Sequence, residues 1–213
     1  GPAAEVLSST AHPALEGDEV GALLAGQVAE RDARWHLVRV AFAGGSLWLR
    51  DSGLPLGRAV RLRVLARDLS LAVRKPTAAE LTRAQKIVAT TKRDADGQFA
   101  DRKAIYALES LALADFPATV PVKLQVLRIG ALTVAAIPCE VFVEIGLALK
   151  ATKPLAEHFT ISLANGYNGY LPTREHHVLG GYETWRARSS YLEVAASEKV
   201  TATLRELLAS VAK

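Results

Sequence analysis

Hydrophobic and polar positions alternate along the first third of the chain, as they do in β-strands that bury one face. The alternation predicts five short strands, over residues 23–30, 35–42, 47–49, 60–64 and 69–73. Gly44-Gly45 predicts a tight hairpin turn, because glycine adopts the positive φ that such turns need. The alternation changes phase at Leu65-Ala66, which predicts a bulge or a corner. This spacing of strands predicts a small OB-like β-barrel over residues 1–76.

From residue 77 onward, helical and strand periods are mixed. The run Thr77-Ala78-Ala79-Glu80 has the spacing of a capping box at a helix start. Pro138 predicts the opening of a helix from Glu140 to Lys150, because proline suits a first helical turn. The remaining periods predict strands over 122–126, 132–137 and 159–163 and a last helix over 200–211. Residues 77–213 therefore form an α/β module with a mixed sheet in this interpretation, and the fold class is α+β.

Composition narrows the class of protein. The chain has 213 residues, of which 50% are hydrophobic and 23% charged, which indicates a folded core rather than a disordered segment. No apolar run approaches the roughly 20 residues that a membrane helix needs, so we expect no membrane span. Cys139 is the single cysteine, which excludes an internal disulfide and a cysteine metal cage. No signal peptide is visible and no methionine is present, so we expect a cytoplasmic protein or a recombinant product in which Gly1-Pro2 is a protease remnant.

Positive charge is concentrated in one segment. Residues 31–75 hold ten basic and three acidic side chains, a net charge of +7, while the whole chain has +4 and the remainder therefore −3. Arg61, Arg63 and Arg67 are the candidate anion-binding residues of this segment. The alternative is a solvated outer face of the strands. Because no aromatic residues are interleaved with these arginines, we expect only weak polyanion binding and no specific recognition of nucleic acid.

Three runs of this basic segment resemble a known family. They are Trp35-His36-Leu37, the hairpin residues Gly44 to Trp48, and the strand residues Arg61 to Ala72. Together they resemble the MOP/TOBE accessory region of molybdate-importer ATPases, over about residues 20–75. That resemblance implies a molybdate- or tungstate-type oxyanion site formed between modules, and hence a homo-oligomer. Only one copy occurs, and no G-x-x-x-x-G-K-[ST] loop is present, so a barrel that serves packing is the leading interpretation.

A second segment is unusually rich in asparagine, glycine and tyrosine. It contains Asn165, Tyr167 and Asn168, and it follows an apolar strand. Tyr182 and Glu183 lie a short distance downstream. Functional loops commonly follow strands in this way, so these five residues form a candidate site loop. The alternative is structural, because Asn-Gly pairs make turns and tyrosines pack with exposed hydroxyls.

The same segment carries a further resemblance. The runs Ile137 to Phe142, Asn165 to Tyr170 and Gly181 to Thr184 occur in the order and spacing typical of the neutral/alkaline ceramidase family. Members are zinc-dependent amidases that cleave the N-acyl bond of ceramide. The resemblance implies that Glu140 and Tyr170 are metal ligands, together with two histidines from an earlier part of the chain.

That earlier part, with the zinc histidines and a catalytic serine, should precede residue 80, where the barrel-like segment stands. His176 and His177 are adjacent, so their side chains should diverge on a strand, and His158 begins a strand as a structural residue. We therefore expect a chimera of two fragments without a complete active site, inactive alone, with no cofactor bound and zinc only if the site is completed. The alternatives are a working metal-dependent amide hydrolase, with zinc held by local histidines, and an oxyanion-binding module.

Overall fold

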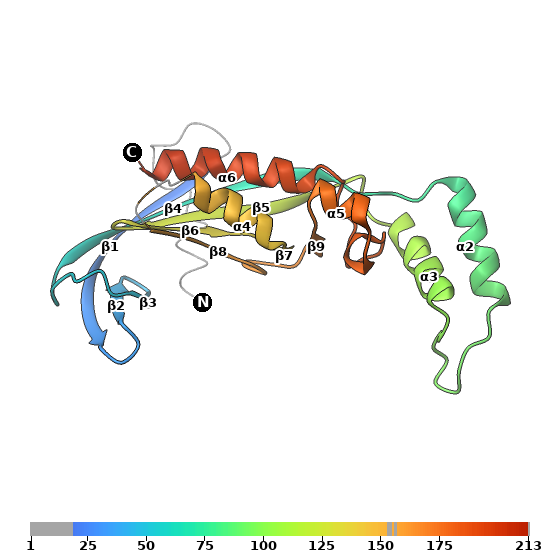
Figure 1. The fold of residues 1–213 in the computed structure, drawn as a ribbon, viewed down its shortest axis with the longest axis horizontal. Helices are drawn as coiled ribbons and strands as arrows, with labels where there is room; N and C mark the ends of the chain where they lie inside the picture. Colours follow the sequence, from blue (N-terminus) through green and yellow to red (C-terminus); the bar gives the residue numbers. More distant parts are fainter. Residues whose placement is uncertain (1–18, 153–154, 156, 213) are drawn as a thin grey trace.

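One curled seven-stranded sheet forms the body of the molecule in the computed structural model, which describes residues 19–152, 155 and 157–212 (Figure 1). The strands lie in the order β3-β2-β1-β4-β5-β6-β8, and all neighbours are antiparallel except β6 and β8. Their bounds are β1 (Glu19–Asp32), β2 (Leu37–Phe42), β3 (Gly45–Arg50), β4 (Ala59–Ala72), β5 (Thr119–Ile129), β6 (Leu132–Ala136) and β8 (Glu157–Ile161). A separate two-stranded parallel sheet pairs β7 (Glu140–Val141) with β9 (Tyr170–Leu171).

The helices lie on one face of the sheet and at one end of it. Their bounds are α2 (Ala78–Thr90), α3 (Arg102–Ala114), α4 (Val143–Ala151), α5 (Arg174–Leu179), the 3₁₀ helix η1 (Tyr182–Thr184) and α6 (Ala196–Ala212). The long helix α6 crosses β4, β5 and β6 with α4 beside it, whereas α2 and α3 form a hairpin that projects from the far end (Figure 1). The α+β class and the mixed sheet are confirmed. No helix within the described residues is long and apolar enough to cross a membrane.

The long strand β4 replaces the two strands predicted over 60–64 and 69–73 and the bulge or corner predicted between them. It is continuous from Ala59 to Ala72, and its pairing with β1 and β5 runs through Leu65 without a shift, so the predicted bulge is wrong. The irregularity lies instead in β1, between Val28 and Glu30. The hydrophobic phase changes because different faces are covered along the strand. Leu62 and Val64 are buried on the face away from α6, whereas Leu65 and Leu71 are buried beneath the helices.

The predicted closed OB-like barrel is not confirmed. Strands β1, β2 and β3 curl away from the body of the sheet, and β3 and β8 remain as separate edges, so the arrangement is a half-barrel (Figure 1). The boundary predicted at residue 76 does not divide the sheet. Strand β4 pairs with β5 from Leu62–Ile129 to Ala72–Thr119. The two segments with different family resemblances therefore share one continuous ladder of hydrogen bonds.

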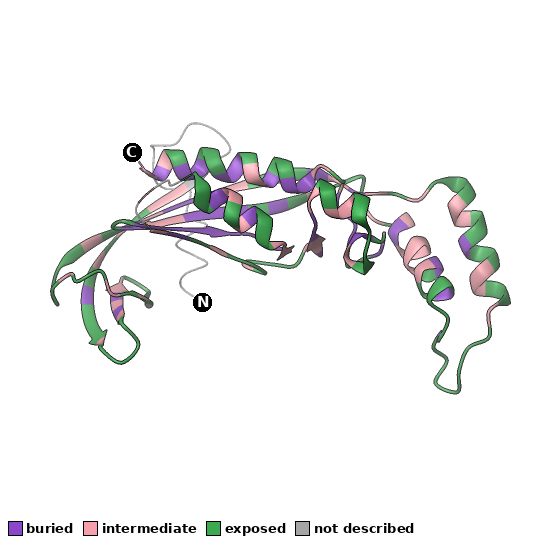
Figure 2. Cartoon of the chain, viewed as in Figure 1, coloured by how far each residue is buried: buried purple, intermediate pink, exposed green. Residues whose placement is uncertain are grey.

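The main core lies between this shared sheet and helices α4 and α6, where Figure 2 shows buried residues on the facing surfaces. Leu65 belongs to the first segment, yet it is buried in the same cluster as Leu124 of β5 and Leu204 of α6. Ion pairs join the same elements, since Arg67 Nη1 lies 2.6 Å from Glu206 Oε2 on α6. Packing of the first segment thus depends on the second.

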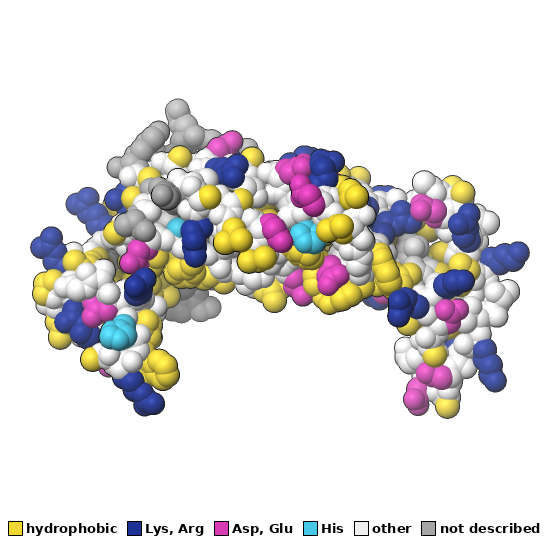
Figure 3. Space-filling view, in the orientation of Figure 1, with side chains coloured by type: hydrophobic (Ala, Val, Ile, Leu, Met, Phe, Trp, Pro, Cys, Tyr) yellow, Lys and Arg dark blue, Asp and Glu magenta, His cyan; other side chains and the backbone are white. Residues whose placement is uncertain are grey.

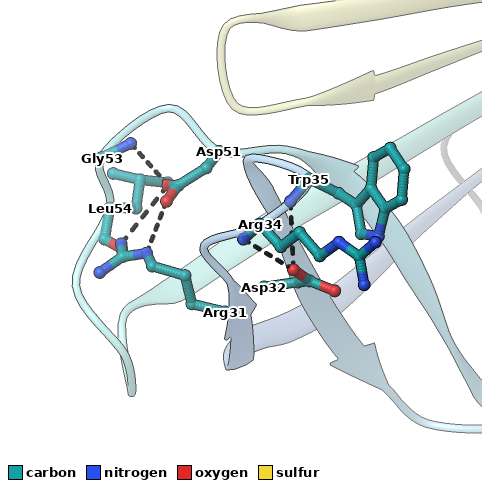
Figure 4. Close-up of polar contacts among 7 residues, drawn as sticks. All are labelled: Arg31, Asp32, Arg34, Trp35, Asp51, Gly53 and Leu54. Atoms are coloured by element: carbon teal, nitrogen blue, oxygen red, sulfur yellow. Dashed lines mark hydrogen bonds and ion pairs between the residues drawn. The ribbon is translucent and has the colours of Figure 1, made fainter.

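The tip of the curled lobe is fixed by polar contacts at the β1–β2 turn (Figure 4). The Asp32 carboxylate accepts hydrogen bonds from the backbone N–H groups of Arg34 and Trp35, at 2.9 and 3.1 Å. Arg31 forms an ion pair with Asp51 at 2.5 Å and donates to the Leu54 carbonyl at 2.6 Å. A backbone hydrogen bond from Gly53 and the Arg31 guanidinium lower the pKa of Asp51. These contacts hold the loop after β3 against the end of β1.

The helix predicted from Glu140 to Lys150 begins later than expected. Helix α4 starts at Val143, with Phe142 as its N-cap residue. Glu140 and Val141 are extended because they pair with β9, so tertiary pairing overrides the local preference for a helix after Pro138. The capping box at Thr77 is confirmed: its hydroxyl accepts from the Glu80 N–H, and the Glu80 carboxylate accepts from the Thr77 N–H.

Candidate functional site

The loop from β8 to β9 is held against the segment that follows β6. The Leu163 and Ala164 N–H groups donate to the carbonyls of Cys139 and Ile137, at 2.9 and 3.0 Å. Further along, the Asn168 N–H donates to the Pro138 carbonyl at 2.6 Å. The loop therefore borders the segment that carries Glu140, and backbone hydrogen bonds define its position.

Two asparagine side chains anchor this loop to the body of the fold. Asn165 has φ of +67° and donates from Nδ2 to Gln125 Oε1 at 2.5 Å. Asn168 donates from Nδ2 to the hydroxyl of the buried Tyr191 at 2.9 Å. Tyr191 in turn packs edge-on against Phe116, with ring centroids 5.3 Å apart. The sequence did not indicate Gln125 or Tyr191 as partners of the loop. Gln125 alternates with apolar residues like any strand residue, and Tyr191 resembles an ordinary packing aromatic.

Glu140 and Tyr170 are direct partners in the β7–β9 pair, so the structure brings these two metal-ligand candidates together. The Tyr167 hydroxyl donates to Glu140 Oε1 at 3.1 Å, and the Tyr182 ring packs edge-on against Tyr170 with centroids 5.7 Å apart. Burial, hydrogen bonding to Glu140 and its charge raise the pKa of Tyr167. Hydrogen bonding to Tyr182, burial and the Glu140 charge raise the pKa of Tyr170. Both phenols are therefore neutral near pH 7.

The remaining site-loop candidate, Glu183, has a structural contact through its backbone. Its carbonyl accepts a hydrogen bond from the Ser190 hydroxyl at 2.6 Å. Arg74 binds the same turn, donating to the carbonyls of Thr184 and Ser190 at 2.9 and 2.6 Å. This arginine belongs to the first segment and holds the 182–190 turn beside β9. No hydrogen bond joins the Glu183 carboxylate to Glu140 or Tyr170 within the described chain.

The histidines occupy other surroundings. His158 is buried in β8, with Nδ1 3.0 Å from the Thr133 hydroxyl, and burial lowers its pKa. His176 and His177 lie on helix α5 rather than on the strand that the sequence suggested. His176 Nδ1 is 2.8 Å from the Thr173 hydroxyl. Burial and then the charge of Arg74 lower the pKa of His177.

The donor set around Glu140 falls short of a metal site. Glu140 and Tyr170 supply two oxygen donors, and a catalytic zinc generally takes about three protein ligands plus water. Among residues 19–152, 155 and 157–212, no group of three His, Cys, Asp or Glu side chains is placed to hold a metal ion. The phenol of Tyr170, with its raised pKa, is also a weak donor before a metal is held. These residues alone therefore do not fit a complete zinc centre.

The candidate anion-binding arginines are separated by the structure. Arg61 and Arg63 line one hollow next to the last turn of α6, where Arg63 donates to the Ser210 carbonyl. Arg67 lies further along β4, paired with Glu206. The hollow also receives Arg58 and Arg128, which the sequence pattern did not single out.

Cys139, the only cysteine in the sequence, is buried next to Glu140. Its burial predicts how the reactivity of the thiol and the stability of the fold depend on pH. Burial raises the pKa of the Cys139 thiol to about 12. At pH 8 we therefore expect a thiol reagent to label the folded protein at least on the order of a thousandfold more slowly than the unfolded chain, whose thiol has an ordinary pKa of about 8.5. Because only the unfolded thiol ionises between these values, stability should fall as the pH rises above about 9. Equally rapid labelling of folded and guanidinium-unfolded protein would contradict the buried position of this side chain.

Comparisons with known proteins find both resemblances. No family model matches the chain. It is 54% identical over 72 residues to the molybdenum import ATP-binding protein ModC of Methylococcus capsulatus, which is 34% of this chain and 20% of that protein. It is 52% identical over 71 residues to the ModC protein of Thiobacillus denitrificans, again 20% of that protein. The chain thus spans about a fifth of the length of these relatives.

Among solved structures, the neutral ceramidase of Pseudomonas aeruginosa resembles this chain with a TM-score of 0.40 and 16% identity. The match covers 80% of this chain and 30% of the ceramidase. A ceramidase structure complexed with C2 gives a TM-score of 0.41 and 14% identity, over 79% of this chain and 31% of that one. The ModC proteins are molybdenum importers, the class of protein that the motifs of the first segment resemble.

Proposed function

We propose that this chain combines two protein fragments into one folded unit that lacks a complete active site. The first fragment is similar to a part of molybdate-importer ATPases, and the larger one is similar to the C-terminal part of a ceramidase-type zinc amidohydrolase. The observation that carries the proposal is the pairing of Glu140 with Tyr170, while no group of three His, Cys, Asp or Glu side chains among the described residues is placed to hold a metal ion.

The geometry of the site loop supports a retained half-site rather than an active centre. The Glu140 carboxylate accepts from the Tyr167 hydroxyl, and the Tyr170 ring packs edge-on against Tyr182, so neighbouring side chains of the chain itself hold both residues in place. Asn165 and Asn168 fix the loop through Gln125 and Tyr191. A loop held in this way keeps its shape without the nitrogen ligands that would complete a zinc site.

The test of this proposal is metal analysis after dialysis against zinc. With two oxygen donors we expect far less than one equivalent of retained zinc and no hydrolysis of ceramide. Glu140→Gln keeps the size of the side chain and should leave the retained zinc unchanged, as should the control Glu144→Gln on the neighbouring helix. About one zinc per chain, lost in Glu140→Gln but kept in Glu144→Gln, would show that other residues complete the site and would favour the hydrolase.

An oligomer is the expected form of this molecule. The sheet has open edges at β3 and β8, and the side chains of Phe159 and Ile161 on β8 are exposed. Unpaired strand edges bearing apolar side chains tend to associate. Light scattering at several protein concentrations measures this, and a monomer at every concentration would contradict the expectation.

A further inference from the structure

The basic hollow beside the C-terminal end of α6 has no role in the half-site around Glu140. From its composition we infer that it is a docking surface for the anionic headgroups of a lipid bilayer. The inference is independent of the proposed function, because it uses a different face and different residues. It is carried by four arginines, an exposed leucine and the absence of acidic side chains among the described residues of the lining.

The geometry follows from where α6 ends. Arg61 of β4, like Leu23 of the neighbouring β1, lies on the face that α6 covers further along the sheet. Helix α6 is described as far as Ala212, and a hollow of about 800 Å³ lies next to this end of the helix, where Arg63 and Arg128 line it. Figure 3 shows Lys and Arg side chains spread over the curled lobe at this end of the molecule.

The four arginines of the hollow differ in their contacts: two bind the end of α6 and two are exposed. Arg63 donates to the Ser210 carbonyl at 2.9 Å, and Arg128 donates to the carbonyls of Val211 and Ala212 at 2.7 and 3.0 Å. These two therefore satisfy the last carbonyls of α6, as basic side chains commonly do at a helix C-terminus. Arg58 and Arg61 are exposed, and within the described part of the chain neither guanidinium has a hydrogen-bond or ion-pair partner.

The guanidinium groups of Arg58 and Arg61 favour a phosphate-bearing ligand. Guanidinium groups bind phosphate through paired N–H donors, so Arg58 and Arg61 suit phosphate-bearing headgroups. Leu23 has 63% of its surface exposed beside them, and Leu56, in the turn before Arg58, has 57% exposed. Basic and aliphatic side chains on one surface are typical of binding at the headgroup–acyl boundary. A nucleic-acid surface would instead be expected to present stacking aromatics, and none is found among the residues described in this lining.

The experiment measures co-sedimentation of the full chain with phosphatidylcholine vesicles, with and without phosphatidylserine. We expect binding only when phosphatidylserine is present, and weakening at high salt. The double variant Arg58→Gln/Arg61→Gln should bind roughly 30-fold more weakly, since each basic residue near an anionic surface contributes about one kilocalorie per mole. Leu23→Ser should also weaken binding several-fold without changing net charge.

The matched control is Arg83→Gln/Lys86→Gln on α2, which removes the same charge from two exposed side chains at the opposite end of the molecule. It should bind vesicles like the unmodified protein. Equal loss in both double variants would indicate net charge alone and overturn the site. Displacement from vesicles by millimolar inorganic phosphate would indicate a small-anion site, and loss of DNA binding with unchanged vesicle binding would indicate a nucleic-acid surface. Either result overturns the proposal.

Discussion

Replacing Gly169 by alanine should destabilise the protein by about 2–5 kcal/mol, combining a left-handed backbone with an overpacked contact. Gly169 has φ of +76°, which disfavours any side chain. A Cβ atom added there would lie 2.4 Å from the Ser189 carbonyl oxygen and 2.7 Å from the carbonyl carbon. That carbonyl cannot easily move away, because it accepts a hydrogen bond from the Tyr170 N–H at 2.7 Å. Denaturant unfolding measures the loss of free energy.

The variant Gly97→Ala separates the cost of the left-handed backbone from the cost of the close contact with Ser189. Gly97 has a nearly identical φ of +75°, but a Cβ atom there would meet nothing within 4 Å. Its substitution should therefore cost only the backbone term, about 1–2 kcal/mol. Equal costs at the two positions would mean that Gly169 does not lie against the backbone of Ser189, and the described closure of the site loop would be wrong.

Leu65→Ala should cost about 2–5 kcal/mol of unfolding free energy, because a fully buried leucine leaves a cavity when it is truncated. Leu65 lies in the first segment of the chain, but its side chain is buried in the main cluster with residues of β5 and α6. The loss should therefore also lower the midpoint at which the second segment unfolds. Circular dichroism of the helices during urea unfolding measures this, because every helix within the described residues follows residue 76.

The control for Leu65 is Leu56→Ala, in the same segment but with an exposed side chain. We expect a change within about 0.5 kcal/mol, as for most surface substitutions. If Leu65→Ala also left helix unfolding unchanged, the first segment would not contribute to the main core.

The sequence pattern located most elements but not their tertiary arrangement. The alternation over 35–42 and 60–64 correctly placed β2 and the first half of β4. It could not show that the phase change at Leu65 marks a strand crossing from one buried face to the other, because a bulge produces the same pattern. The pairing of β4 with β5, which joins the curled strands to the rest of the sheet, was also not visible because the two strands are distant in sequence.

At the candidate site, too, the sequence indicated the loop itself but not the residues from distant parts of the chain that contact it. The Asn-Gly-Tyr run indicated an ordered polar loop, and the family resemblance pointed to Glu140 and Tyr170, which the structure pairs. The partners of the loop were not visible in the sequence. Gln125 alternates with buried residues as a surface strand residue would, and Arg74 follows a strand like any flanking basic residue. Their roles arise only when residues far apart in the chain meet.

The measurement that tests the central claim most directly compares unfolding at the two ends of the molecule. One variant would keep only Trp48, in β3 of the first segment, and a second only Trp185, which follows η1 and packs against Tyr106 with ring centroids 5.1 Å apart. If the two segments form one cooperative unit through the β4–β5 pairing and the shared core, the two fluorescence transitions in urea should coincide in midpoint and slope. Two separate transitions, one for each tryptophan, would show that the segments fold independently and would contradict the account.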